Sequence, residues 1–169
     1  MTEILNNIKK SFNAWLAGEL EGETINFDKD PFRTDGLESW YAVRYSGYSS
    51  ESTGMSDLIS ESGTQKGIYR ILDAEVSAWS RDDEQRATLG EMADKIMELC
   101  EEASITLYDF EDPENPVEAG SIYLSAKKGV FSPKWSGGSG VWKTDSDAHE
   151  RMRVVGFVLE VEMRVLAEV

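Results

Sequence analysis

The sequence contains one cysteine and one histidine among its 169 residues, and these shortages limit the chemistry that it can support. Cys100 has no partner for an internal disulfide, which suits a reducing compartment, and its place on a helical apolar stripe predicts a buried small hydrophobe. A zinc site or a Cys–His nucleophile pair would need more of both residues. His149 lies in the polar stretch DSDAHERMR, where a solvated surface side chain is expected. We therefore predict no cofactor, no metal ion and no catalytic residue.

Long apolar runs and basic residues are also scarce. No apolar segment approaches the ~20 residues that cross a bilayer, and charges spread through the N-terminus argue against a signal peptide. The 17 basic residues face 32 acidic ones, which gives a net charge of −15. Such a field opposes tight binding to a polyphosphate, so we expect a cytosolic protein without specific nucleic-acid binding or membrane contact. Two interpretations of the charge stay open: an ordinary solvated surface, or a surface that must repel DNA.

Two amphipathic helices are predicted within a single domain that covers residues 1–169. Hydrophobic content of 40% and five tryptophans are typical of a folded chain of this length. The first helix is expected to begin near Thr2, as N-cap, and to end before Gly18; the second is expected to begin at Ser80 or Asp82. Spacings of three and four predict the buried stripes. They are Ile4, Leu5, Ile8, Phe12, Trp15 and Leu16 in the first helix, and Leu89, Met92, Ala93, Ile96, Met97 and Cys100 in the second.

Alternation of apolar and polar residues predicts the strands. They lie at 24–28, 40–48, 68–79, 105–110, 121–126 and along the C-terminal stretch RVVGFVLEVEMRVLAEV. One face of that last stretch is apolar and is expected to pack against both helices. The stretch is either an edge that serves as an assembly surface or an inner strand paired with 68–79. The predicted fold class is α+β, with two helices on one face of a mostly antiparallel or mixed sheet.

Two further segments are expected to be exposed. The tract 46–67, rich in Ser and Gly, predicts a long loop or an extended hairpin that forms an arm. In the region 127–150, the arms 130–135 and 140–144 are expected to pair through the turn SGGSG. Apolar and aromatic residues here either contact other proteins or pack beneath their own loops. The interface candidates are Tyr45, Tyr48, Met55, Leu58, Phe131, Trp135 and Trp142.

The order of these elements resembles that of the tail-terminator proteins of long-tailed bacteriophages, a family of tail-to-head joining or tail-completion proteins. The resemblance covers most of the chain and lies in INFDKDPFRTDGLESWYAVRY, then a strand leading directly into ATLGEMADKIMELCE, then the closing RVVGFVLEVEMRVL. It implies a structural virion protein, not an enzyme, that forms a homohexameric ring. This ring would cap the tail tube, stop its polymerisation and dock the head–tail connector at the head-proximal end of the tail, after assembly in the host cytoplasm.

Passage of DNA through such a ring would give the acidic charge a purpose, because an acidic lumen repels phosphates and lets DNA slide without binding. Candidates for the acidic lumen or surface are Glu51, Asp57, Glu61, Glu160 and Glu162. Three alternatives stay open. They are another phage neck or tail-completion protein, a small acidic protein-binding module outside viruses, and an enzyme whose site is built from scattered carboxylates and tyrosines.

Overall fold

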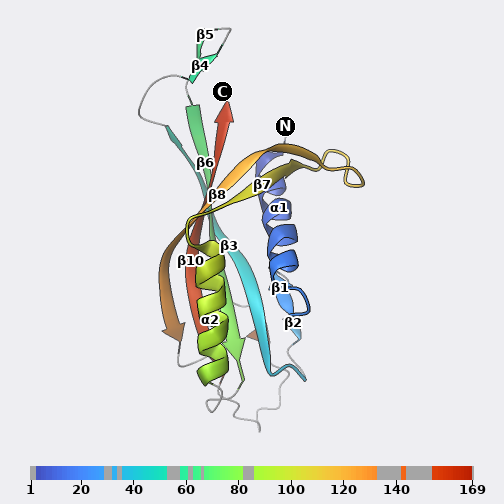
Figure 1. The fold of residues 1–169 in the computed structure, drawn as a ribbon, viewed down its shortest axis with the longest axis vertical. Coiled ribbons are helices and arrows are strands. Elements are labelled where there is room, and N and C mark those ends of the chain that lie inside the picture. The colour runs from blue at the N-terminus through green and yellow to red at the C-terminus, as the bar shows by residue number, and fades with distance from the viewer. Residues whose placement is uncertain are drawn as a thin grey trace.

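A computed structural model describes residues 3–28, 32–33, 36–52, 58–60, 63–65, 67–81, 86–132, 142–143 and 154–168. Within these ranges the chain is an α+β fold with two helices and a six-stranded mixed sheet that curls into half of a barrel (Figure 1). The helices are α1 (Ile4–Glu19) and α2 (Arg86–Cys100). The sheet contains β1 (Ile25–Phe27), β3 (Ser39–Ser52), β6 (Gly67–Ser80), β7 (Ala103–Asp109), β8 (Val117–Ser132) and β10 (Val155–Glu168).

The C-terminal strand lies inside this sheet. The strand order is β1-β3-β6-β10-β8-β7, with β1 parallel to β3 and the other neighbours antiparallel. β10 pairs with β6 along its whole length, from Val155 opposite Ser80 to Glu168 opposite Gly67. Its other side pairs with β8. Of the two alternatives left open by the sequence, the inner strand is therefore the one observed.

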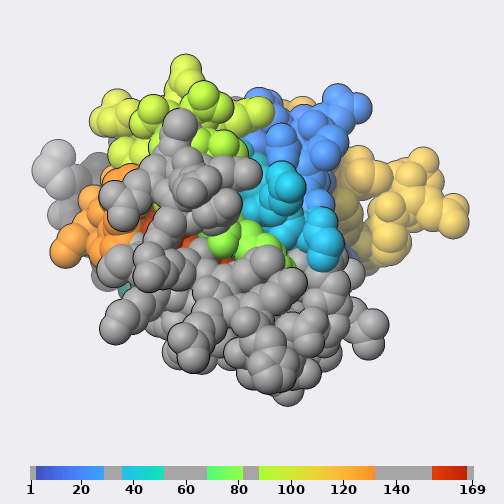
Figure 2. Space-filling model, turned by 90° about the horizontal axis from the view of Figure 1, so that it is seen from below, coloured from blue at the N-terminus to red at the C-terminus, as the bar shows by residue number. Residues whose placement is uncertain are grey.

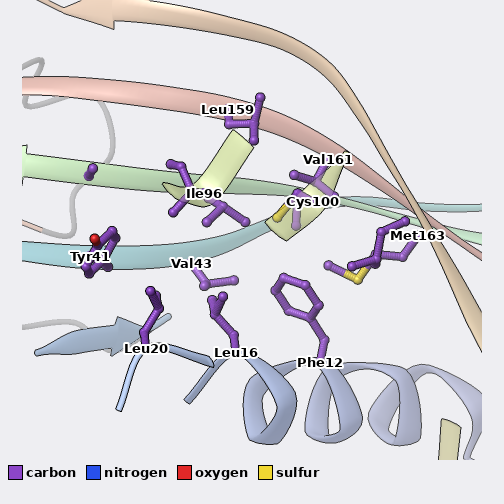
Figure 3. Close-up of a cluster of buried hydrophobic side chains, with 14 of the residues drawn as sticks. Phe12, Leu16, Leu20, Tyr41, Val43, Ile96, Cys100, Leu159, Val161 and Met163 are labelled. Atoms are coloured by element: carbon purple, nitrogen blue, oxygen red, sulfur yellow. The ribbon is translucent and has the colours of Figure 1, made fainter. Parts of the chain in front are cut away.

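Both helices cover the same face of the sheet, as Figure 2 shows. Phe12 and Leu16 of α1 and Ile96 of α2 meet the apolar face of β10, where Leu159, Val161 and Met163 are at most 1% exposed (Figure 3). Each fully buried side chain of this kind contributes about 1.5–3 kcal/mol to folding. Both predicted helical stripes are confirmed as facing the core or packing against it. Cys100 is buried as expected.

Helix α1 contacts β7 at one end of the sheet order and β3, the second strand from the other end, so it lies across the open side of the half-barrel. Towards β7, the Tyr108 amide donates a hydrogen bond to Ser11 Oγ (2.9 Å), and the Phe110 amide donates one to Asn7 Oδ1 (3.2 Å). Towards β3, the Tyr45 hydroxyl donates to Asn13 Oδ1 (2.5 Å). These polar side chains satisfy backbone amides along the outer edge of β7, which protects that edge from pairing with another chain.

The opposite face of the sheet carries a smaller apolar cluster formed by Trp40, Ala42, Trp79 and Val154. The Trp79 Nε1–H donates a hydrogen bond to Ser77 Oγ (2.8 Å), which fixes the indole ring. Gly156 lies directly opposite Trp79 in the β6–β10 pair, and a Cβ atom at Gly156 would lie 2.4 Å from the ring. The indole therefore packs on bare backbone, and a glycine is required here for space.

The predicted start and end of α1 and the predicted cap of α2 need correction. Helix α1 begins at Ile4 with Glu3 as its N-cap residue, and it continues through Gly18 to Glu19. Glycine in a helix interior costs roughly 1 kcal/mol. Burial of Leu20 just beyond the helix end, at 1% exposure, offsets that cost. Ser80 is not a helix cap, because it is the buried last residue of β6 and pairs with β10. The alternative cap, Asp82, lies outside the described residues.

The two exposed segments contain more strand than the sequence indicates. Within 46–67, β3 continues to Ser52 and remains paired with β6, while β4 (Leu58–Ser60) pairs with β5 (Gly63–Gln65). Residues 53–57, 61–62 and 66 are not among the described ones. Within 127–150, residues 130–132 belong to β8 and pair with β10. β9 (Trp142–Lys143) pairs with β2 (Phe32–Arg33), so the described parts of the two predicted hairpin arms have other partners. The turn SGGSG and His149 lie outside the described residues.

Candidate interaction surfaces

Strands β3, β6 and β10, each of 14 residues, continue beyond the two helices at the end where the C-terminus lies (Figure 1). The part beyond Val165, the last residue of β10 in the main buried cluster, is called the strand extension below; it contains residues 51–52, 67–69 and 166–168. Leu166 is 40% exposed on it, and Tyr48 is 43% exposed on β3 before the extension begins. Large side chains exposed on a sheet are not buried by the rest of their own chain, so this region is suited to contact with another protein.

Ion pairs link β3, β10 and β8 next to the strand extension. Arg164 lies 3.4 Å from a carboxylate oxygen of Glu51, forms a close ion pair with Glu162, and places its guanidinium 5.8 Å from the Tyr69 ring centroid. Lys127 Nζ lies 3.3 Å from the other carboxylate oxygen of Glu162. Burial alone would raise the pKa of Glu162, but hydrogen bonds from Arg164 and Lys127 outweigh it and hold that pKa below its ordinary value. Two of the predicted acidic candidates, Glu51 and Glu162, are thus balanced by cations.

Next to these pairs, the face of the sheet away from the helices is hollowed by about 280 Å³, lined by residues that include Asp73, Glu75, Lys127 and Glu160. Glu160 is exposed and lies opposite Glu75 of β6 on one side and Lys128 of β8 on the other. Like charges in directly opposed positions repel, and the neighbouring lysine offsets this. The open sheet face therefore carries charges of both signs.

Strand β8 has an open edge in the described part of the chain. Its residues 117–124 pair with β7, whereas residues 125–132 pair only with β10. Val130 is 48% exposed and Phe131 is 61% exposed in this segment, and Phe131 stacks on Phe157 with the ring centroids 4.8 Å apart. Lys127 and Lys128 are exposed there too. An unpaired strand edge with exposed apolar side chains is a template for protein contact.

The turn between β7 and β8, residues 110–116, is acidic. Asp112 orders it by accepting hydrogen bonds from the Glu114 amide and from Asn115 Nδ2, both at 3.1 Å, and the side-chain bond contributes most to the lowered pKa of Asp112. Together with its flanking residues the turn borders a hollow of about 550 Å³. The lining residues are Asp109, Glu111, Asp112, Asn115, Val117, Glu118 and Ala119. Val117 is 66% exposed, so an apolar side chain lies among the carboxylates.

The predicted interface residues fall into four groups. Tyr48 and Phe131 are exposed on strands. Tyr45 packs against α1, where its hydroxyl bonds Asn13 and Lys9 Nζ lies 5.1 Å from its ring centroid, and burial raises its pKa. The backbone of Leu58 and Trp142 lies in short strands. Met55, Trp135, Asp57 and Glu61 lie outside the described residues.

Sequence reasoning overlooked several exposed residues of these surfaces. Tyr123 is 54% exposed beside the ion pairs, and Val117, Val130 and Leu166 were assigned only to strands or passed over. The signal for them was present in part, since a large apolar residue on the polar side of an alternating strand is exposed by its position. Recognising these exposed residues required correct strand boundaries, and the predicted strands were shorter than the observed ones.

None of the described helices is long and apolar enough to cross a membrane. Among the described residues, no three His, Cys, Asp or Glu side chains are grouped so that they could hold a metal ion. Compared with models of known protein families and with curated proteins, the chain shows no match. Its function must therefore be inferred from the surfaces themselves.

Proposed function

We propose that this protein is a phage tail terminator, a structural and non-catalytic protein that forms a homohexameric ring on the end of the tail tube. The ring stops polymerisation of the tube protein, offers a docking surface to the head–tail connector and lets DNA pass. It is assembled in the host cytoplasm and remains at the head-proximal end of the virion tail.

The strand extension carries this proposal. Three strands run beyond the two helices and expose Leu166 there. A monomer gains little from such an extension, because its side chains add no apolar burial under the helices, whereas an assembly buries them against a neighbour. The element order that resembles the tail terminators and the fold of two helices on one face of a mixed sheet agree with this function.

Charge supports the passage of DNA. The net charge of −15 repels phosphates at any surface that DNA approaches closely. Of the described acidic candidates, Glu160 is exposed, while Glu51 and Glu162 are paired with Arg164. We therefore assign the repulsion to Glu160 and to the overall charge. A ring whose channel is lined by Lys and Arg would contradict this assignment.

Electron microscopy of the purified full chain, alone and mixed with polymerising tail-tube protein, tests the proposal. Sixfold rings, or tubes capped at one end and uniform in length, are expected. The matched control is tube protein polymerised without this chain, which should give tubes of variable length. Tubes that stay uncapped and variable in the presence of a monomeric protein would refute the proposal and favour a protein-binding module outside tails.

A further inference from the structure

The open edge of β8 and the acidic β7–β8 turn lie on opposite sides of the molecule. In Figure 1 the turn projects at the upper right while the far end of β8 lies at the lower left, and Figure 2 shows the gold turn and the orange strand end on opposite flanks. One strand carries both, since β8 runs from Val117 to Ser132. Residues 117 and 128 are separated by up to roughly 36 Å of extended chain at about 3.3 Å per residue, so the two surfaces do not meet within one subunit.

The two surfaces are complementary in charge. The edge exposes Lys127, which also pairs with Glu162 of its own subunit, and Lys128. The turn with its flanks exposes Glu111, Glu114 and Glu118. Two copies of a chain with a net charge of −15 repel one another at most orientations. A basic strand edge is a place where the acidic turn of a second copy is attracted instead, which favours one orientation of approach over others.

The edge of β8 and the turn are also complementary in their apolar residues and in their hydrogen-bonding groups. Val130 and Phe131 are exposed on opposite faces of this edge strand, and Val117 is exposed beside the hollow of about 550 Å³ at the turn. Carboxylates of the turn are acceptors for amide N–H groups along a strand edge, and charge-assisted hydrogen bonds of this kind are stronger than neutral ones. The contact therefore offers apolar burial, hydrogen bonds and charge pairing at one place.

A second pair of adjacent lysines, on α1, is a weaker candidate for the same role. Lys9 Nζ lies 5.1 Å from the Tyr45 ring centroid, and Lys10 Nζ lies 5.5 Å from the Phe110 ring centroid. These lysines lie on a helix without a strand edge beside them to receive carboxylates.

We propose that the 125–132 edge of β8 binds the β7–β8 turn of a second copy of this chain, in a head-to-tail contact between opposite sides of neighbouring subunits. A contact of this type repeats from copy to copy and closes into a ring when the rotation per subunit allows it. The inference deepens the proposed function by naming the surfaces that join neighbouring subunits, and it rests on that function for the closure of the ring.

Charge reversal in the full-length chain tests the contact. One variant reverses the turn (E111K/E114K/E118K), a second reverses the edge (K127E/K128E), and a third carries both sets. Sedimentation velocity and light scattering measure self-association over a range of concentrations and salt. Each single set is expected to weaken self-association by about tenfold or more, since like charges then face each other across the contact. High salt is expected to weaken association of the wild type.

Mixing separates a lost contact from a damaged fold. The two single-set variants mixed in equal amounts, and the variant with both sets, should each recover association, because opposite charges again face each other at every contact. A misfolded variant would not recover on mixing, and thermal unfolding of each variant alone provides a second check. The matched control for the turn variant is E91K/D94K/E98K on the exposed side of α2, which reverses the same number of acidic residues and should leave this contact intact.

The outcomes distinguish this contact from the proposed function. Rings that persist in both single-set variants would overturn the contact and leave the ring function standing. Charge-dependent association into open chains, with tubes uncapped, would support the contact and refute the terminator. Association that stops at dimers would overturn the head-to-tail contact, which leaves a free surface at each end of a dimer. A wild type that stays monomeric at all concentrations and on tube ends would refute both.

Discussion

Replacement of Gly156 by alanine is expected to lower the free energy of unfolding, and the structure fixes the reason. The new Cβ atom would lie 2.4 Å from Cε3 and Cζ3 of Trp79 and 2.9 Å from Cδ2. Trp79 is 3% exposed and is held by its hydrogen bond to Ser77, so the ring cannot retreat without breaking that bond. Gly156 is not among the residues with a positive φ angle, so backbone strain plays no part.

The expected loss follows from three contributions. Overpacking of a filled site costs about 1–3 kcal/mol. Loss of the indole hydrogen bond adds roughly 0.5–1.5 kcal/mol. The lower chain entropy of unfolded alanine returns about 0.4–1 kcal/mol, which leaves a net destabilisation of roughly 0.5–4 kcal/mol. Urea unfolding followed by tryptophan fluorescence, at one fixed protein concentration, measures it.

Gly90→Ala is the matched control, because a Cβ at this position of α2 has nothing within 4 Å. Here the same chemical change should stabilise the helix by up to about 1 kcal/mol. Combining Gly156→Ala with Trp79→Leu should remove most of the penalty of the alanine, since the contact that causes it is gone. A Gly156→Ala variant as stable as the wild type would refute the close packing of the indole on this strand.

Two further predictions concern buried polar groups. Tyr45→Phe removes the hydrogen bond to Asn13 and should lower the free energy of unfolding by about 1 kcal/mol; an unchanged urea midpoint would show that the hydroxyl does not tie α1 to β3. Burial raises the pKa of the Cys100 thiol from 9.0 to about 12, so the folded state favours the neutral thiol. This contribution to stability is fully present below pH 9.0 and is lost as the pH rises from there towards about 12. Cys100→Ala should therefore show a flatter decline in unfolding free energy across that window, and rapid alkylation of native Cys100 at pH 8 would contradict its burial.

Local patterns were sufficient for much of the core. The alternation in β10 placed Leu159, Val161 and Met163 on the face that the helices cover, because the pleat sends successive side chains to opposite sides. The helical stripes were equally readable, since a period of 3.6 residues leaves few choices for the buried side. Boundaries were less predictable: β3 continues to Ser52 through a polar stretch, because pairing with β6 rather than its own composition keeps it extended.

The interaction surfaces were also predictable in part: exposure could be inferred from local sequence, whereas contacts between distant segments could not. The sequence supplied Tyr48 and Phe131 as exposed aromatics, and both are exposed, but their role in an interface stays a prediction. It gave no means to foresee that Tyr45 would turn towards α1. The tight packing of Trp79 on Gly156 was also beyond it, because that contact depends on the register between two strands far apart in the chain.

The sequence by itself determined the helices, the alternation of the long strands, the buried thiol and the acidic charge, since each depends on residues close together in the chain or on simple composition. Only the tertiary structure decided that β10 lies between β6 and β8 and that α1 spans the half-barrel. It also decided that residues 125–132 of β8 and the acidic turn lie on opposite sides of the molecule. Strand pairing uses backbone groups that every residue carries, so the choice of partner is made by packing across the whole domain.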